Sequence, residues 1–322
     1  MNKKLFIVER FLFGLLIMFL FIGNCYSTPI VAEPVMPITE GKSDLKIKFS
    51  YFEANGFYND STNFSEFQVG ESRNGYEVMV GLKYGSGKDS EMELKVPYIY
   101  KNHIKPGDNK LSCSGFGDVY LIGKNKVIDN KISQSFMAIS LGAKFPTGKS
   151  IYNVNKNVLP TGSGTWDIIG GIYLQEKREN FIIYGDISYI YRFGLVSSGF
   201  AGYGISEINS AETEVKITPG GSLNLNLAAE YPLFKLISVI TELNWVFNYE
   251  SRVEYVKSGV DALSDLTLKS PELQKSNTFK STSGVKIYLG NNISFGVGVG
   301  VPMSMVNSYG GLTYFVNAEA IF

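Results

Sequence analysis

An all-β fold, a transmembrane antiparallel up-and-down β-barrel of about 12 strands, is predicted by three features of the sequence. The chain ends in a strand-like alternation, contains many further segments of the same period, and joins them by alternately long and short connections. From Leu312 to Phe322 every second residue is apolar or aromatic, while polar residues such as Thr313 and Glu319 lie between them. A period of two over this length gives one face to lipid and the other to a polar interior.

The same period defines the other strands. In residues 222–231, Leu225 and Leu227 share one face with further apolar residues, and Asn224 and Glu230 share the other. No helical period competes over these spans. The predicted strands are 45–54, 75–84, 91–100, 118–127, 135–145, 166–175, 181–193, 222–231, 236–250, 278–289, 293–303 and 312–322.

The connections predict a membrane barrel rather than a soluble β-sandwich, because long external loops and short periplasmic turns alternate in outer-membrane barrels. Glycine and asparagine in 85–90 and 290–292 suit turns that need a positive φ. The alternatives are ten or fourteen strands, if 45–54 does not span or if 251–277 hides a further hairpin. The long gaps are 55–74, 101–117, 146–165, 194–221 and 251–277, with a shorter sixth at 304–311, and the short ones are 85–90, 128–134, 176–180, 232–235 and 290–292.

Aromatic residues fall at both ends of the predicted strands, where the girdles of a membrane barrel belong. The set near the outer strand ends is Tyr98, Tyr100, Phe145, Tyr191, Phe193, Phe247 and Tyr249, and the set near the periplasmic ends is Tyr84, Phe181, Tyr231 and Phe322. A soluble sandwich would also alternate, but it would not need these girdles.

The N-terminus predicts export. Basic residues flank an apolar run at 11–23, which suits a secretory signal and falls short of the roughly 20 residues of a spanning helix. Cleavage is expected after Ser27; the alternative, a lipidated Cys25, is disfavoured by Asn24 before it. The predicted parts are a signal peptide at 1–27, a periplasmic lead at 28–44 that plugs or caps the lumen, and the outer-membrane barrel at 45–322.

Charge and cysteine content exclude several classes of protein. Removal of the signal takes away three Lys/Arg and one Glu, which leaves 27 basic and 29 acidic residues and a net charge of −2. This balance gives no electrostatic footprint for nucleic acid. Cys113 is then the one remaining cysteine, so no intrachain disulfide is expected.

Four segments carry a resemblance to a known family. They read LKVPY at 94–98, GFGDV at 115–119, LGAKFPTG at 141–148 and LPTGSGTWD at 159–167. With the C-terminal half, they make most of the mature chain resemble the outer-membrane β-barrels of the phenol-degradation meta-pathway family, broadly called transporters. The resemblance implies a barrel that handles a small aromatic molecule.

These motifs have the chemistry of turns. Pro146 cannot donate to a β-ladder and Gly148 permits a turn, so the Pro-Thr-Gly corner ends a strand. The corner recurs at 160–162, and Asp118 is expected to point inward as the next strand begins. A phosphate-binding loop is disfavoured, because no helix N-terminus follows the glycines.

Charged residues of both signs fall on the predicted inner face. They either neutralise one another and fill a narrow barrel or line a small polar conduit. The mixture argues against strong ion selectivity, and about 12 strands enclose less space than the 16 to 18 of general porins. The inward aromatic residues Phe52, Tyr120, Phe136 and Tyr173 would add apolar steps. The candidate lumen-lining residues are Lys46, Lys48, Glu77, Lys83, Glu93, Lys95, Asp118, Tyr120, Lys124, Lys144, Asp167, Asp186, Arg192, Glu230, Glu242 and Lys286.

The sequence bears on three possible functions. An outer-membrane hydrolase needs a Ser nucleophile with a His base, but the one histidine, His103, is expected in an external loop with no Ser beside it. No catalytic residue, cofactor or metal site is therefore expected. The preferred function is a barrel that passes or receives a small hydrophobic or aromatic molecule through a narrow lumen. The alternative is a structural or surface-interaction barrel with a plugged lumen.

The expected location is the bacterial outer membrane, with both termini in the periplasm. The expected partners are outer-membrane lipid, the small-molecule substrate, and the barrel-assembly machinery. The last would act through the strand that ends at Phe322, which resembles the C-terminal assembly signal of outer-membrane barrels.

Overall fold

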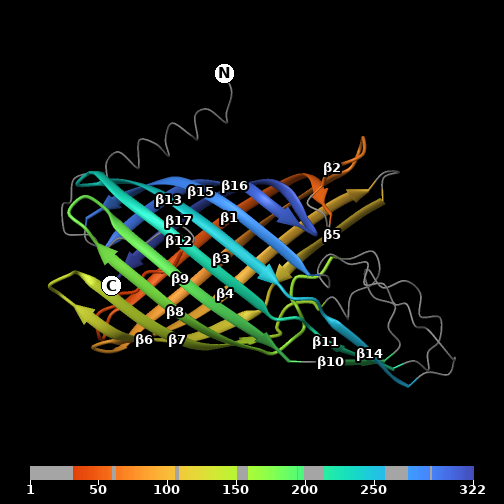
Figure 1. Cartoon of the computed structure of the whole chain (residues 1–322), viewed down its shortest axis with the longest axis horizontal. Helices are drawn as coiled ribbons and strands as arrows, with labels where there is room; N and C mark the ends of the chain where they lie inside the picture. The colour runs from red at the N-terminus through yellow and green to blue at the C-terminus, as the bar shows by residue number, and fades with distance from the viewer. Residues whose placement is uncertain are drawn as a thin grey trace.

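The computed structural model describes residues 32–59, 63–105, 109–150, 159–193, 195–198, 214–257, 275–290 and 292–322; the predicted signal peptide at 1–27 lies outside them. The main element is a closed barrel of 12 antiparallel strands (Figure 1). Around the barrel these are β1 (Ser43–Tyr58), β3 (Ser72–Gly87), β4 (Ser90–Lys105), β6 (Val119–Asn130), β7 (Ser135–Phe145), β8 (Asp167–Lys177), β9 (Ile182–Arg192), β12 (Ser222–Phe234), β13 (Ile237–Asn248), β15 (Ser276–Leu289), β16 (Ile293–Val306) and β17 (Ser308–Ile321).

The barrel confirms the predicted fold class, since each of the predicted strand ranges overlaps one barrel strand. Closure is made by β1 and β17, whose register runs from Asp44 opposite Ile321 to Tyr58 opposite Ser308. A closed sheet leaves no unpaired edge, which is the condition for strands to cross a membrane. Among the described residues, no helix is both long and apolar enough to do so.

The two ends of the barrel differ, and we name them by their connections. The turn end carries the C-terminus and most of the short connections, and the loop end is the opposite one (Figure 1). The connection expected at 304–311 is wrong in length: β16 and β17 run on until only Asn307 separates them at the loop end. At the turn end, the connection expected at 85–90 is shorter than predicted: β3 continues through a bulge at Gly85–Gly87, and the turn consists of residues 88–89. Gly290 has a φ of 77° at another turn, as its sequence suggested.

Several ranges expected to be loops contain additional strands. β4 runs on to Lys105 and forms a hairpin with β5 (Asn109–Phe116), and β2 (Phe64–Glu66) pairs with the end of β1. A separate three-stranded sheet at the loop end consists of β10 (Leu195–Ser198), β11 (Glu214–Thr218) and β14 (Arg252–Lys257). The range 251–277 therefore holds a strand, but that strand pairs with β11 and not within the barrel. Period two missed these strands because beyond the membrane neither face has to be apolar.

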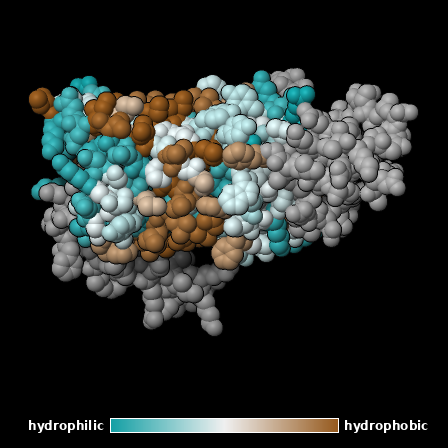
Figure 2. Space-filling view, turned by 90° about the horizontal axis from the view of Figure 1, so that it is seen from below, coloured by the Kyte–Doolittle hydropathy of each residue, from teal (hydrophilic) through white to brown (hydrophobic). Residues whose placement is uncertain are grey.

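The outer face of the barrel carries an apolar belt, visible in brown in Figure 2. Exposed apolar side chains occur on strand after strand, including Leu82, Leu94, Leu141, Ile172, Leu227, Leu243, Val299 and Val316. The alternate positions on the same strands are polar or charged and mostly buried, such as Lys83, Glu93 and Asn317. Side chains that alternate in this way place lipid outside and a polar lumen inside.

Candidate functional site in the lumen

The N-terminal segment, residues 32–42, enters the barrel at the turn end: residues 32–38 are buried or half-buried, and residues 39–42 are exposed. Ala32 and Val35 are completely buried, each with 0% exposure. Ala32 packs against Tyr184 and Ala228, and Val35 packs against Ala138 and Tyr173. Since these partners belong to strands β7, β8, β9 and β12, the segment contacts the inner wall over a broad arc.

Side chains of the wall satisfy the backbone of the N-terminal segment. An irregular buried segment has no ladder of its own, so its N–H groups need other acceptors. The N–H of Ala32 donates to Glu242 Oε2 at 3.2 Å, and that of Glu33 donates to Asp186 Oδ2 at 3.4 Å. Two further bonds run from Val35 to Gln175 (3.3 Å) and from Ile38 to Glu91 (3.0 Å).

Glu33 is the charged anchor of this segment. Its carboxylate oxygens lie 2.9 Å from Lys95 Nζ and 3.4 Å from Lys83 Nζ. Burial disfavours the charged carboxylate, but Lys95 and Lys83 outweigh that effect and hold the pKa of Glu33 well below its usual range. Lys124 adds a hydrogen bond from Nζ to the Pro34 carbonyl at 2.9 Å. The segment is thus fixed by opposite charges as well as by packing.

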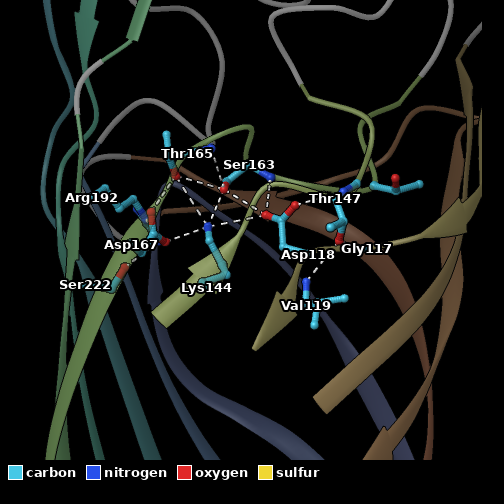
Figure 3. Close-up of polar contacts among 12 residues, drawn as sticks. Gly117, Asp118, Val119, Lys144, Thr147, Ser163, Thr165, Asp167, Arg192 and Ser222 are labelled. Carbon is cyan, nitrogen blue, oxygen red and sulfur yellow. Dashed lines mark hydrogen bonds and ion pairs between the residues drawn. The ribbon is translucent and has the colours of Figure 1, made fainter. Parts of the chain in front are cut away.

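A second polar network lies at the loop end, where the sequence motifs meet (Figure 3). Asp118 accepts hydrogen bonds from Gly148 N (3.1 Å), Ser163 N (2.8 Å) and Ser163 Oγ (2.9 Å). Thr147 Oγ donates to the Gly117 carbonyl at 2.8 Å, and Thr161 Oγ donates to that of Phe116 at 2.9 Å. Asp118 therefore ties both Pro-Thr-Gly corners to the strand break between β5 and β6.

Basic side chains extend this network across three strands. Lys144 Nζ lies 3.3 Å from Asp118 Oδ2 and 2.5 Å from Asp167 Oδ2. Arg192 Nε is 3.8 Å from the same Asp167 oxygen, and its terminal nitrogens donate to the Gly220 carbonyl and to Ser222 Oγ, each at 2.7 Å. Asp118, Lys144 and Asp167 are nearly inaccessible, with exposures of 6%, 4% and 2%. We call these residues, with Ser163 and Thr165, the Asp118 network.

Between the two covered ends, the inner wall is accessible. Inner-face residues near the N-terminal segment, such as Lys83, Glu242 and Lys286, are buried, and so are those of the Asp118 network. At intermediate levels many inner-face side chains are only half-buried, although Asn244, Thr282 and Thr313 at these levels are buried. Space wide enough for solvent therefore remains inside the barrel between the covers. We call the half-buried inner-face residues between the covers the mid-lumen wall; they are Lys48, Ser50, Phe52, Glu77, Ile99, Tyr120, Ser188, Asn226, Lys280 and Phe315.

The candidate residues from the sequence divide into four groups. Lys83, Glu93, Lys95, Lys124, Asp186 and Glu242 surround the N-terminal segment. Asp118, Lys144, Asp167 and Arg192 meet in the Asp118 network. Glu230 accepts from Tyr288 Oη at 2.5 Å, and Lys286 lies 3.3 Å from Glu319, both at the turn end. Lys46, Lys48, Glu77 and Tyr120 have no ion pair within 4.0 Å among the described residues.

The sequence predicted that His103 lies in an external loop, and this prediction is wrong. It is in β4, where pairing with β5 prolongs the strand, and it is only 5% exposed. Its Nε2 lies 3.0 Å from Glu71 Oε1, and the rings of Phe67 and Tyr309 have centroids 6.2 Å from the imidazole. Arg73 stacks on Tyr309 at 3.6 Å. The contacts of this histidine are thus a carboxylate and aromatic rings. In the part of the chain that is described, no group of three His, Cys, Asp or Glu is placed to hold a metal.

Sequence reasoning missed several residues of these networks. The sequence gives no sign that Glu33 binds Lys95 or that Gln175 accepts a hydrogen bond from Val35. Both contacts join the N-terminal segment to strands far along the chain. Thr147 and Thr161 do carry a signal, the repeated Thr between Pro and Gly, but that pattern predicts a turn and not the hydrogen bonds of the hydroxyls. The Thr147 hydroxyl donates to the Gly117 carbonyl, and the Thr161 hydroxyl donates to the neighbouring Phe116 carbonyl.

No family model matches the chain. The structure is similar to that of a COG4313 outer membrane channel from Pseudomonas putida F1, with a TM-score of 0.66 and 12% identity over 89% of this chain and 98% of that one. The translocator domain of the autotransporter NalP from Neisseria meningitidis gives a TM-score of 0.46 at 10% identity, over 88% of this chain and 89% of that one. At these identities the likeness concerns the fold, and of the two only the first has a TM-score above 0.5. The protein is a transmembrane β-barrel of the outer-membrane type.

Proposed function

We propose that this barrel lies in the bacterial outer membrane, with its turn end toward the periplasm, and that its lumen passes or receives a small hydrophobic or aromatic molecule. The accessible mid-lumen wall between two covered ends carries the proposal, because a purely structural barrel has no need of an internal space. Phe52, Tyr120 and Phe315 place aromatic surface on this wall. The motif resemblance to the phenol-degradation family and the similarity to a channel from Pseudomonas putida F1 support it.

Export and assembly belong to the same proposal. Residues 1–27 would be removed as a signal peptide, and the assembly machinery would recognise the strand that ends at Phe322. The Phe322 ring is 66% exposed on the outer face, while its backbone bonds to Ser43 in both directions at 2.9 Å. An exposed terminal aromatic whose backbone already belongs to the barrel is available to lipid and to an assembly factor.

A structural barrel with a plugged lumen is the second candidate, and the buried N-terminal segment favours it. If the segment never leaves, the turn end stays closed and nothing crosses. The two candidates thus differ in whether the N-terminal segment and the cover at the loop end can move aside to open the lumen.

Planar-bilayer conductance and whole-cell uptake separate the candidates. We would compare the full barrel with a variant that lacks residues 32–38, which hold all four of the backbone bonds to the wall described above. Transport predicts that the shortened variant conducts more current and that a deletion strain loses uptake of aromatic compounds. A silent barrel in both forms, with unchanged uptake across a panel of aromatic and aliphatic compounds, would retire the transport function.

A further inference from the structure

Two lysines of the mid-lumen wall differ from most of the other inner cations. Lys83, Lys95, Lys124, Lys144 and Lys286 each have a carboxylate oxygen within 4.0 Å. Lys48 and Lys280 have none among the described residues. Lys48 Nζ instead lies 5.0 Å from the centroid of the Phe315 ring, and Lys280 Nζ lies 3.5 Å from Thr313 Oγ1. A cation held away from bulk water without a counter-charge is costly, so these two ammonium groups attract an anion.

Both lysines approach the same stretch of β17. Thr313 and Phe315 are successive inward positions on that strand, about 7 Å apart. Lys48 reaches them from β1, which pairs with β17, and Lys280 reaches them from β15, on the far side of β16. The two positive charges therefore flank one short patch of the wall.

Aromatic surface completes this patch. The Phe315 ring lies against β16, where a Cβ on Gly300 would come within 3.1 Å of its Cε2 atom, so glycine lets the ring lie close to the wall. Phe52 is the register partner of Thr313 on β1. Both rings are half-buried, as is Lys48. The wall thus presents two rings and two cations to the internal space.

Three acids act on Lys48 from beyond 4.0 Å: Glu242 of β13, Glu77 of β3 and Glu33 of the N-terminal segment. Glu242 also lies one inward position from Asn244, the register partner of Lys280, but its carboxylate accepts from the backbone of Ala32. Glu77 lies opposite Ser50 of β1. It forms no ion pair within 4.0 Å among the described residues, and it lies on the β1 side of the patch, away from Lys280. None of these acids forms an ion pair with Lys48 or Lys280 among the described residues, so the patch keeps two ammonium groups without a direct counter-charge.

We propose that Lys48, Lys280 and the ring of Phe315 form a binding site for a small aromatic anion of the benzoate type. The carboxylate would lie between the two ammonium groups, and the aromatic ring would pack against Phe315 and Phe52. Charge-assisted hydrogen bonds and ring contacts then act on opposite ends of one small molecule. This site names the substrate class of the proposed function and rests on it for its biological meaning, although binding itself does not require transport.

The test is equilibrium binding to the purified barrel in detergent micelles, by calorimetry, with three probes. Benzoate carries ring and charge, benzyl alcohol carries the ring alone, and cyclohexanecarboxylate carries the charge without aromaticity. We expect benzoate to bind most tightly. Lys48→Gln and Lys280→Gln should each weaken its binding by about tenfold, and Phe315→Leu by about threefold. Lys235→Gln, at an exposed turn, is the matched control and should change nothing.

Lys48→Arg keeps the positive charge and should bind benzoate within a few-fold of the wild type. If Lys48 only filled space, the affinity for benzoate would not depend on whether the substitute is charged Arg or neutral Gln. Benzoate binding that survives both Lys→Gln changes, or that equals benzyl alcohol binding, would overturn the site. Uptake of benzyl alcohol in whole cells reports the proposed function separately. If that uptake persists while benzoate binding is indifferent to the lysines, the site is wrong and the transport function stands.

Discussion

Removing the charge of Glu33 should release the N-terminal segment from the lumen. The carboxylate joins the segment to Lys95 at 2.9 Å and to Lys83 at 3.4 Å, and no other residue of 32–42 makes an ion pair with the wall among those described. Glu33→Gln keeps the size of the side chain and removes its charge. Within 4.0 Å, both lysines then retain only Glu93 among the described residues, at 3.2 Å from Lys95 and 4.0 Å from Lys83.

The size of the effect follows from these two contacts. A hydrogen bond to a charged group contributes about 1.5 kcal/mol at the lower end of its range, so two contribute about 3 kcal/mol. The lower end applies because the Glu33 side chain is 21% exposed and Gln still accepts a neutral hydrogen bond. A change of about 3 kcal/mol raises the population of the undocked segment about 10²-fold.

Cysteine labelling measures that population. Val35 is fully buried against Ala138 and Tyr173, so a Val35→Cys thiol reacts with a water-soluble maleimide only when the segment leaves. In a background with both native cysteines replaced by Ser, Glu33→Gln should raise the labelling rate about 10²-fold. Glu40→Gln, an exposed position on the same segment, is the control. Equal labelling rates in the two variants would refute the assignment of Glu33 as the anchor.

Four further outcomes are expected. Gly85→Ala should also expel the segment, since its Cβ would lie 2.3 Å from the Thr39 carbonyl, and Val35→Cys labelling would show it. Asp118→Asn should expose the adjacent loop, measured as faster tryptic cleavage after Lys149; unchanged cleavage would argue against the network. Phe322→Ser should lower the amount of heat-modifiable barrel, and normal levels would contradict the anchor. Because the pKa of Glu33 is lowered, docking should persist as pH falls through the usual Glu range and fail only below it, by spin-label mobility at Met36→Cys.

The barrel itself could be predicted because its strands obey one local rule. In β12, for example, Leu227 faces lipid while Asn226 and Glu230 face inward, and neither placement depends on a distant residue. The rule fails where no membrane imposes it. β5 and β14 lie beyond the apolar belt, and their pairing partners rather than their own pattern decide that they are strands.

The covers of the lumen could not be located in the same way. The segment 32–42 has no period, and Ala32 finds its acceptor on Glu242, more than 200 residues away in sequence. The sequence was enough to predict that this segment plugs or caps the lumen. It was not enough to predict how deep the segment reaches or that Glu33 is its anchor, because these depend on distant residues. The sequence predicts that Asp118 points inward and that Gly148 permits a turn, but it does not predict that the N–H groups of Gly148 and Ser163 donate to Asp118. A motif read for backbone conformation conceals the side-chain hydrogen bonds that it also supplies.

The charges that line a lumen act over short distances, so the ion selectivity of the lumen depends on where the unpaired charges lie. Opposite charges 3 Å apart, such as Glu33 and Lys95, cancel for any ion more than a few ångströms away, whereas an unpaired charge continues to act over about 10 Å at 0.1 M salt. The sum over all inner residues is near neutral, and by itself it predicts little selectivity. Nearly all of that neutrality resides in the pairs that hold the two covers. In the accessible middle, Lys48 and Lys280 have no such pair among the described residues, and they outnumber the one unpaired acid of that wall, Glu77, so a molecule there meets a net positive charge. Selectivity should therefore follow the unpaired lysines and not the total charge.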